Sequence, residues 1–389
     1  MKPNSAKKVL VQCDELAAVT DEPGRITRTF HSPAMQRANK LVGGWMRQAG
    51  LAVSEDAAFN LFGRWSSANP KAKTLLLGSH LDTVRDAGKY DGPLGVLVAL
   101  AAVEKLKTSG VALPFHIEVV GFSDEEGVRY QTTYLGSRAL AGKLTKADLA
   151  LIEEKGIEKA RRKAGEFLAY AEVHIEQGPV LESRNLGVGV VTAIASQKRV
   201  KVTFTGQAGH AGTTPMHGRR DALCGAAEFI TAVENCGILG TVGIVEVHPG
   251  ASNVIPGKVE LSLDLRDQSD AVCDRIYRRL HEHADRIVSR RQLTLTWDLL
   301  QETDAVPCDK ALTKLMRRVV AAHETAVVAM PSGAGHDAAV MASLCPMAML
   351  FIRCKDGISH HPAESVQAAD VAKSIDVLSD FIVALAATS

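Results

Sequence analysis

The sequence of 389 residues predicts an α/β protein that is interrupted by a smaller α+β domain. Two observations predict this fold class. Short apolar runs alternate with helical patterns in the first and last parts of the chain, which is typical of a mainly parallel sheet covered by helices. Between them the expected order changes to strand, helix, strand, strand, helix, strand. We therefore expect one larger domain formed by residues 1–195 and 306–389, and an inserted domain formed by residues 196–305.

The first part of the larger domain alternates helices and strands. Residues 26–49 predict a helix-rich start, and residues 94–106 predict a helix. The apolar runs 73–79 and 115–122 predict buried strands, and the first of them ends at His80. Functional groups collect at the carboxyl ends of strands in such sheets, so the residues after these two strands are candidates for a site.

The expected order of strands and helices in the inserted domain is that of the ferredoxin-like fold. Beyond it, residues 309–324 predict a helix and residues 348–353 a buried strand of the larger domain. Within the insert, the expected strands are residues 200–206, 241–247, 258–266 and 292–299, and the expected helices are residues 218–236 and 270–290.

Charge and cysteine content exclude several classes of function. The chain has 45 Lys and Arg against 44 Asp and Glu, so it lacks the basic surplus of proteins that bind nucleic acids or anionic membranes. No apolar run reaches the roughly 18 residues that span a bilayer, and the first residues do not resemble a signal peptide. Seven scattered cysteines without a CxxC motif are typical of cytosolic thiols. We expect a cytoplasmic protein that binds neither nucleic acid nor membrane.

The segment around the first predicted strand end holds candidate metal ligands. His80 in GSHLDTV could bind a metal, and Asp82 could orient its ring. Asp91 in KYDGPLGV could bridge two metal ions, because a carboxylate has two oxygens to share. Asp91 could equally cap the helix that follows it, with Pro93 in the first turn. The residues alone leave both interpretations open.

The acid run SDEEG follows the second predicted strand. Such a run is usually a solvated loop, but Glu125 and Glu126 could also divide the work of a metal site. One carboxylate would bind metal while the other accepts a proton as a general base. His174 in HIEQG and His360 in GISHHPAE add imidazoles, and mixed His and carboxylate ligation suits Zn or Mn. No compact signature such as HExxH is present, so spacing is only moderately specific.

The insert contributes three polar candidates. His210 lies in the turn-rich loop GHAGTTP, and Asn253 in SNVIP offers an amide. Arg266 in DLRD could clamp a substrate carboxylate with two hydrogen bonds. It could instead pair with Asp264 or Asp267 on the surface, and that alternative stays open.

Nine motifs in order, from about residue 75 to residue 366, resemble one family. They are GSHLDTV, KYDGPLGV, SDEEGVRY, HIEQGPVLE, GHAGTTPM, SNVIPG, DLRD, SGAGHDA and ISHHPAE. The chain is similar to the carbamoylase group of two-metal amidohydrolases, which includes N-carbamoyl-L-amino-acid hydrolases, β-ureidopropionases and allantoate amidohydrolases. This group is related to aminoacylases and metallocarboxypeptidases. The resemblance implies an aminopeptidase- or carboxypeptidase-like catalytic domain with the insert as a lid and dimerisation domain.

The resemblance also implies an activity and roles for single residues. The activity is metal-dependent hydrolysis of a ureido C–N bond in a small carboxylate-bearing substrate by a homodimer, with two divalent ions, Mn or Zn, in each subunit. The run before ISHHPAE and the GHAGTTPM motif favour allantoate; an N-carbamoyl-L-amino acid or β-ureidopropionate is the alternative, and a dipeptide or acyl amide a more distant one. By resemblance, the two ions are held by five ligands, with Asp91 shared between them: His80, Asp91, Glu126, His174 and His360. Glu125 is the general base by resemblance. The residues that bind substrate are Gln177, His210, Asn253 and Arg266, and the residues that line the pocket are Gly335 and His336.

Overall fold

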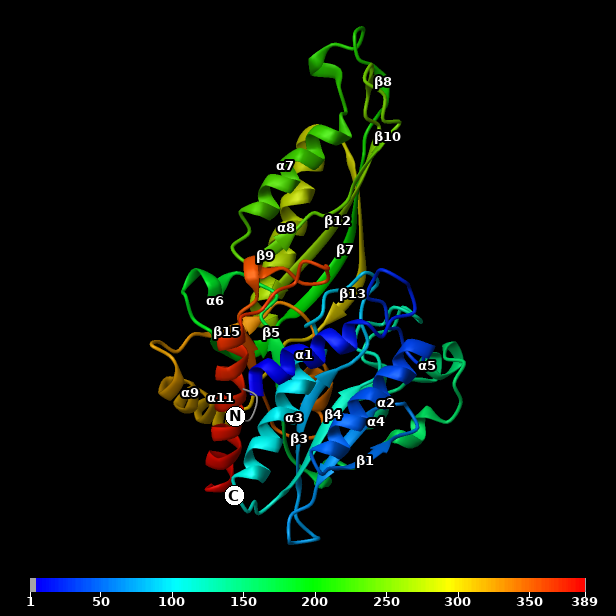
Figure 1. Ribbon diagram of the computed structural model, residues 1–389. Coiled ribbons are helices and arrows are strands. Elements are labelled where there is room, and N and C mark those ends of the chain that lie inside the picture. The colour runs from blue at the N-terminus through cyan, green and yellow to red at the C-terminus, as the bar shows by residue number, and fades with distance from the viewer. Residues whose placement is uncertain (1–4, 389) are drawn as a thin grey trace. The chain divides into compact units, whose positions relative to one another are not determined.

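The computed structural model describes residues 5–388, which form two compact units (Figure 1). The larger unit contains the chain up to Thr192 and again from Cys308, and the smaller unit is Ala193–Pro307. The chain therefore leaves the larger unit once and returns to it.

The larger unit is built on a mixed sheet, whose nine described strands lie in the order β1-β2-β4-β3-β5-β16-β6-β14, with β15 paired to β6. The edge strand β14 and the end of β6 with which it pairs fall within the residues of the smaller unit. The four central strands β4, β3, β5 and β16 are parallel, whereas the pairs toward both edges are antiparallel. The prediction of a mainly parallel sheet is thus right only for the centre. The strands are β1 (Ala52–Glu55), β2 (Leu61–Trp65), β3 (Thr74–His80), β4 (His116–Phe122), β5 (Phe167–Ile175), β6 (Val188–Ile194), β14 (Val306–Pro307), β15 (Ala329–Ser332) and β16 (Met347–Ile352).

Helices cover this sheet through a shared apolar core. α3 (Pro93–Thr108) is buried along most of its length and packs against β3 and β5, with α1 (Ser5–Ala17) and α11 (Ala368–Ala386) beside it. α2 (Pro33–Gln48) starts where Ser32 Oγ accepts a hydrogen bond from the Met35 amide at 3.1 Å. The other α-helices of this unit are α4 (Leu135–Ala141), α5 (Lys146–Leu151), α6 (Val180–Ser183), α9 (Lys310–His323) and α10 (Asp337–Met341), and short 3₁₀ turns occupy Ile157–Ala160, Ala164–Glu166 and Lys355–Gly357.

The smaller unit is an antiparallel sheet with two helices on one face. Its strands lie in the order β10-β12-β7-β13, and β9 also pairs with β12. Val200, Val202 and Phe204 alternate along β7 toward the helices, where they form a core of their own. The elements are β7 (Ser196–Thr205), β8 (Gly209–His210), a 3₁₀ turn (Met216–Gly218), α7 (Ala222–Glu234), β9 (Leu239–Thr241), β10 (Val245–His248), β11 (Val254–Ile255), β12 (Lys258–Asp267), α8 (Asp270–Arg291) and β13 (Thr294–Thr303).

Two sequence expectations differ from these elements. The single strand expected at residues 241–247 is two strands, because β9 and β10 are separated by residues 242–244 and pair with different parts of β12. Residues 26–32, expected in a helix-rich segment, precede α2 and are not helical. Within residues 5–388, none of the helices has the length and apolar character needed to cross a membrane.

Candidate metal centre

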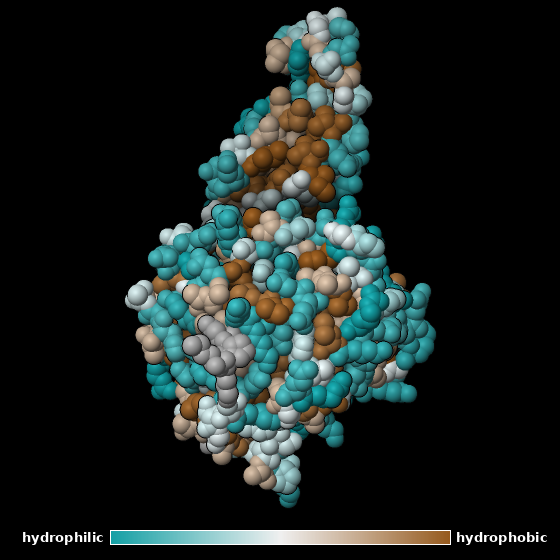
Figure 2. Space-filling model, viewed as in Figure 1, coloured by the Kyte–Doolittle hydropathy of each residue, from teal (hydrophilic) through white to brown (hydrophobic). Residues whose placement is uncertain are grey.

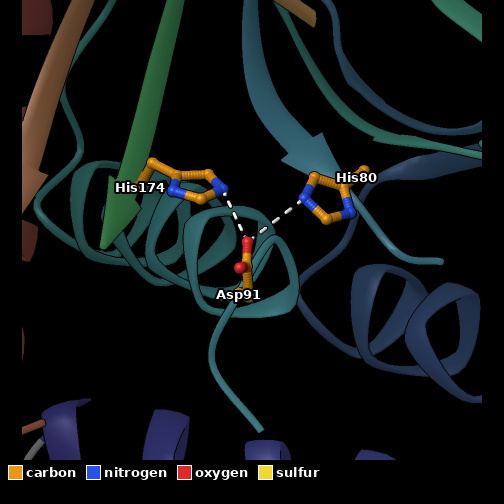
Figure 3. Close-up of side chains that lie close together, drawn as sticks. All are labelled: His80, Asp91 and His174. Atoms are coloured by element: carbon orange, nitrogen blue, oxygen red, sulfur yellow. Dashed lines mark ion pairs between the residues drawn. The ribbon is translucent and has the colours of Figure 1, made fainter. Parts of the chain in front are cut away.

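Parallel pairing in the larger unit brings two histidines together. His80 is the last residue of β3, and His174 lies near the end of the neighbouring parallel strand β5. Both rings are almost completely buried. Asp91, which precedes α3, lies between them, as Figure 3 shows.

The two oxygens of Asp91 face different partners. Oδ1 lies 3.6 Å from His80 Nε2 and 3.1 Å from His174 Nε2. Oδ2 lies 3.1 Å from His360 Nε2, in the loop after β16. Ligands at about 2.1 Å from a tetrahedral metal ion are about 3.4 Å apart, so these separations match the edges of a coordination shell. Asp91 is placed as a bridging ligand would be.

The tautomers of the two buried histidines suit metal binding. His80 Nδ1 lies 3.0 Å from the carbonyl oxygen of Asp82, and His174 Nδ1 lies 2.9 Å from that of Ile175. A carbonyl oxygen can only accept, so each Nδ1 carries the proton and each Nε2 is left to face Asp91. This arrangement is how proteins orient imidazole ligands.

A second group shares Asp91. Glu126 Oε1 lies 3.3 Å from His360 Nε2, and the ligand atoms of Asp91, Glu126 and His360 all lie within 4.8 Å of one another. The His360 side chain is 48% exposed, so this part of the centre is open to solvent. The interpretation of Asp91 as a helix cap is wrong, because Gly92 is the N-cap of α3 and no side chain caps it.

Gly92 allows the close approach of Asp91 to His80. Its φ is +80°, a conformation that side chains rarely adopt, and a Cβ at this position would lie 2.4 Å from Cε1 of His80. Only glycine fits between Asp91 and His80.

The acid run is held in place rather than solvated. The carboxylate of Asp82 accepts hydrogen bonds from the amides of Glu125 at 3.0 Å and Glu126 at 3.1 Å. Glu125 is only 8% exposed, and Asp124 is buried beside it. The solvated-loop interpretation is therefore wrong, and the Asp82 carboxylate orients the acid loop while its carbonyl orients His80.

The electrostatics of these residues favour a bound cation. Burial raises the pKa of Glu125 well above its usual value and that of Glu126 to about 7. Burial also opposes ionisation of Asp91, but attraction from His174, His360 and His80 outweighs it and lowers the pKa of Asp91. Burial lowers the pKa of His80, yet its contacts with Asp82 and Asp91 raise it overall. Crowded buried carboxylates with facing imidazoles are the donor set of a divalent cation, so the residues fit Zn or Mn.

Glu125 differs from its neighbour. Its carboxylate oxygen is within 4.8 Å of ligand atoms of His80 and Glu126, but it joins neither group that contains Asp91. Among residues 5–388 its side chain accepts no hydrogen bond from a described partner. A carboxylate that is close to the ligands and unengaged can accept a proton.

Glu364 is a residue that we did not predict for the site. Its Oε2 accepts hydrogen bonds from the amides of Tyr90 at 2.9 Å and Asp91 at 3.2 Å, and its Oε1 accepts one from the amide of His360 at 3.0 Å. It thus ties two ligand loops together. The available signal was its place in the ISHHPAE motif, four residues after His360.

Gln177 and His336 lie against the ligands. Gln177 Nε2 donates to Asp91 Oδ2 at 2.8 Å and to Ser359 Oγ at 3.1 Å. The His336 ring centroid is 4.5 Å from that of His174, and its Nε2 lies 2.8 Å from Ser332 Oγ. Gln177 Oε1 and His336 Nδ1 are buried and have no hydrogen-bond partner in the described chain. Each therefore has one buried polar atom that a bound group could meet.

The three candidates of the insert lie at two places in the smaller unit. His210 in β8 pairs with Val254, next to Asn253, whose carbonyl oxygen accepts a hydrogen bond from the Ala211 amide at 2.9 Å. Arg266 lies at the C-terminal end of β12, away from His210 and Asn253, and its Nε is 2.8 Å from Oδ1 of Asp264. The alternative in which Arg266 pairs with Asp264 is thus the one seen in the structure.

Fold and site together define a metal-dependent hydrolase. The chain belongs to peptidase family M20/M25/M40, whose sequence profile matches residues 76–384. It is 42% identical to N-carbamoyl-L-amino acid amidohydrolase from Geobacillus stearothermophilus, over 94% of each chain. It is 38% identical to allantoate deiminase from Arabidopsis thaliana, over 94% of this chain and 79% of the relative. Ureidoglycolate hydrolase from the same plant is 37% identical over 95% of this chain and 84% of the relative.

Solved structures agree with this membership. A hydantoinase/carbamoylase family amidase from Burkholderia multivorans matches with a TM-score of 0.90 at 31% identity, over 97% of each chain. Aminopeptidase PepT from Bacillus cereus shares the fold, with a TM-score of 0.68 at 16% identity, over 98% of this chain and 99% of that one.

Proposed function

We propose that this protein hydrolyses a ureido C–N bond in a small carboxylate-bearing substrate, with allantoate as the first candidate. The observation that carries the proposal is the position of Asp91. One of its oxygens faces His80 and His174, and the other faces His360. A carboxylate placed in this way serves two ions at once.

Two ions, Mn or Zn, would be held by the two groups that share Asp91. Divalent ions there would polarise the ureido carbonyl and make water more acidic at neutral pH. The first group is His80, Asp91 and His174, and the second is Asp91, Glu126 and His360.

Glu125 is the general base in this proposal. Its carboxylate lies close to the ligand atoms of His80 and Glu126, where it can take the proton of the attacking water. It then gives that proton to the nitrogen that leaves the ureido carbon. Asp82 supports this role, because it fixes the backbone of Glu125 through the amide hydrogen bond at 3.0 Å.

The choice of substrate rests on the relatives and on the polar atoms near the centre. The named relatives act on N-carbamoyl amino acids, allantoate and ureidoglycolate, which all contain a ureido group. Allantoate has two ureido arms, so it needs hydrogen-bond partners beyond the reacting carbonyl. Gln177 Oε1 and His336 Nδ1 are polar atoms without partners in the described chain and support this choice. The 42% identity to the Geobacillus enzyme favours N-carbamoyl-L-amino acids as the second candidate.

The insert supplies substrate ligands as a lid in this proposal, and its geometry supports a homodimer. Arg266 lies opposite Gln197 on β7, whereas His210 follows the other end of β7 after Thr205. Thr205 is eight positions along the strand from Gln197, which is about 26 Å. Figure 1 shows β8 and β9, which mark these places, at opposite ends of the smaller unit. Arg266 and His210 of one chain are thus too far apart to touch one small substrate, and two chains would each supply one of them.

Exposed apolar surface on the smaller unit supports pairing through this unit. Ten large apolar side chains are exposed in the described chain, and seven of them lie within Ala193–Pro307. Figure 2 shows apolar surface over α7, where Leu223 is exposed. Ile244 and Leu300 line one hollow of this unit, and contiguous exposed apolar surface marks interaction sites. The seven are Met216, Leu223, Leu239, Ile244, Val245, Leu299 and Leu300.

The cysteines support a reducing compartment such as the cytoplasm. All seven are free thiols, and all but Cys224 are buried. Proteins of oxidising compartments more often join such cysteines in disulfides.

The test is a comparison of kcat/KM on Mn-loaded protein, with ammonia release as the readout. The substrates are allantoate, N-carbamoyl-L-methionine and N-carbamoyl-β-alanine. We expect allantoate to be hydrolysed best. A tenfold preference for either carbamoyl amino acid would replace allantoate by the second candidate. Hydrolysis of a dipeptide or an acyl amino acid without any ureido hydrolysis would contradict the proposal as a whole.

A further inference from the structure

Tyr134 has an unusual backbone conformation directly beside the acid loop. It is the N-cap of α4, with φ 62° and ψ 31°, in the left-handed region that few non-glycine residues adopt. Its amide donates to the carbonyl oxygen of Glu125 at 3.1 Å, and its own carbonyl accepts from the Arg138 amide at 2.8 Å. Such conformations persist where the surroundings impose them, and they concentrate at functional sites. The backbone of the proposed base therefore holds Tyr134 in place.

The phenol of Tyr134 reaches the loop that precedes α10. A Cβ built on Gly335 would lie 1.8 Å from the Tyr134 hydroxyl and 3.1 Å from its Cζ. Gly335 is followed by His336, whose ring packs on His174. The phenol thus connects the loop of the base with the loop that supports a metal ligand.

Tyr134 lies at a partly exposed position of this region. Tyr134 and Gly335 are partly exposed, whereas Glu125 and His336 are buried. The Tyr134 amide is hydrogen-bonded to Glu125 and the Tyr134 hydroxyl lies against the residue before His336, which makes the phenol a candidate neighbour of a substrate whose carbonyl lies beside Glu125. The hydroxyl can both donate and accept a hydrogen bond, which matches a ureido group with its N–H donors and carbonyl acceptor.

We infer that Tyr134 is a specificity-determining residue, whose hydroxyl bonds the polar group that the substrate carries beyond the reacting ureido carbonyl. The inference rests on the proposed function and narrows its substrate class to ureido acids with a second polar arm. Gln177 and His336 supply buried atoms on the ligand side, and Tyr134 supplies the partly exposed partner.

The test is Tyr134→Phe, which keeps the ring and removes the hydroxyl. We expect kcat/KM for allantoate to fall about tenfold, the effect of one hydrogen bond, and kcat/KM for N-carbamoyl-L-methionine to change less than about twofold. Tyr130→Phe is the matched control, because the Tyr130 hydroxyl donates to Glu154 at 2.8 Å in the same loop. Loss of that structural hydrogen bond should change kcat/KM for both substrates by the same factor.

A second pair of variants tests the position of the phenol. Gly335→Ala should lower activity on both substrates, because its Cβ meets the Tyr134 hydroxyl. Gly335→Ala with Tyr134→Phe should be more active on N-carbamoyl-L-methionine than Gly335→Ala alone, since the remaining contact is with a ring carbon at 3.1 Å.

The outcomes separate this inference from the proposed function. The inference alone would be overturned if the wild-type protein hydrolysed both substrates and Tyr134→Phe lost kcat/KM equally on both. It would also be overturned if Tyr134→Phe lost no kcat/KM on allantoate. A double variant no better than Gly335→Ala would overturn it as well. A wild-type enzyme inactive on every ureido acid would overturn the proposed function and the inference together.

Discussion

Asp91 joins more of the candidate site than any other single side chain discussed above. Its carboxylate faces three imidazoles and accepts hydrogen bonds from Gln177 and Ser359. Its amide is held by Glu364. Burial alone would favour the neutral acid, so the surrounding positive and donor groups are what keep Asp91 ionised. An ionised, oriented carboxylate with two accessible oxygens is the condition for sharing it between two ions.

The two adjacent glutamates should respond differently to the same change. Glu125→Gln should keep the fold and both ions but lose activity by about 10²–10⁴-fold, the usual contribution of a positioned general base. Glu126→Gln should instead lower the affinity of one ion, because it removes a charged ligand from the group with Asp91 and His360. Steady-state kinetics and elemental analysis of the same preparations measure both effects. If Glu125 controlled metal content and Glu126 did not, the two roles would be exchanged.

Glu364 should affect metal binding without touching the metal. Glu364→Gln removes the charge that holds the amides of Tyr90, Asp91 and His360, and loss of such supporting bonds typically lowers metal affinity about 10–100-fold. Excess Mn²⁺ should restore most of the activity.

Glu324→Gln is the matched control for Glu364. Glu324 accepts hydrogen bonds from two amides, those of Gly187 at 2.6 Å and Val188 at 3.1 Å, away from the ligands. It should lower thermal stability and leave the Mn²⁺ affinity unchanged. Equal Mn²⁺ affinity in both variants would show that Glu364 does not position the ligand loops.

At the scale of elements, apolar runs predicted the strands that matter most for the site. β3, β4 and β16 are fully buried, so their sequences are mostly apolar, and β3 and β4 end where the chain reaches the site. His80 and the SDEEG segment were predicted as site candidates because they lie at the ends of two of these strands. The parallel register that sets His174 beside His80 is a long-range pairing, and a single sequence does not specify it.

Other elements were missed for local reasons. α1 was not predicted, because its buried face, which includes Val9, Cys13 and Leu16, is interrupted by charged residues. The antiparallel edge was missed because β1 and β2 are short and β1 is largely exposed. The expected strand at residues 241–247 contains Gly243 between its two apolar parts, which is a common place for a strand to end.

The turn before α3 gives a prediction at this scale. Gly92→Ala should weaken metal binding and activity, because its Cβ would lie 2.4 Å from the His80 ring and its φ of +80° disfavours alanine. Gly110→Ala is the control, since Gly110 has φ +72° but no atom within 4 Å of the added Cβ. Thermal unfolding should show a stability loss in both variants, and Mn²⁺ titration should show an affinity loss in Gly92→Ala only. An affinity loss in neither variant would contradict the close approach at Gly92.

At the scale of the whole molecule, the proposed ligands are scattered from residue 80 to residue 360. Composition and spacing predicted that histidines and acids follow strands, but they left the roles of Asp91 and Arg266 open. The resemblance to a family assigned the ligands, and the structure brings five of them together. The contacts of Glu364 with Tyr90, 274 residues away in the sequence, depend on tertiary folding and could not be predicted from local pattern.

The proposed homodimer leads to a complementation experiment. Glu125→Gln and His210→Ala should each be nearly inactive alone. If His210 acts in the neighbouring subunit's site, mixed dimers would contain one site with both residues intact and recover part of the activity. Mass spectrometry of differently labelled subunits measures the exchange.

A mixture of Glu125→Gln and Glu126→Gln is the control for this experiment. Both defects lie in the same loop, so every site in a mixed dimer keeps one of them and no activity should return. Absence of recovery in the Glu125→Gln and His210→Ala mixture, despite proven exchange, would show that each site is built from one chain.

The most direct test of the central claim is a titration of metal-free protein with Mn²⁺, followed by calorimetry and by ammonia release from a ureido acid, with Asp91→Asn in parallel. We predict that wild-type protein is inactive without metal, binds two ions per chain and regains activity as the sites fill. Asp91→Asn, which weakens the shared ligand, should lose affinity at both sites and remain inactive. Full activity of the metal-free wild-type protein, or full activity with a single bound ion, would contradict the account.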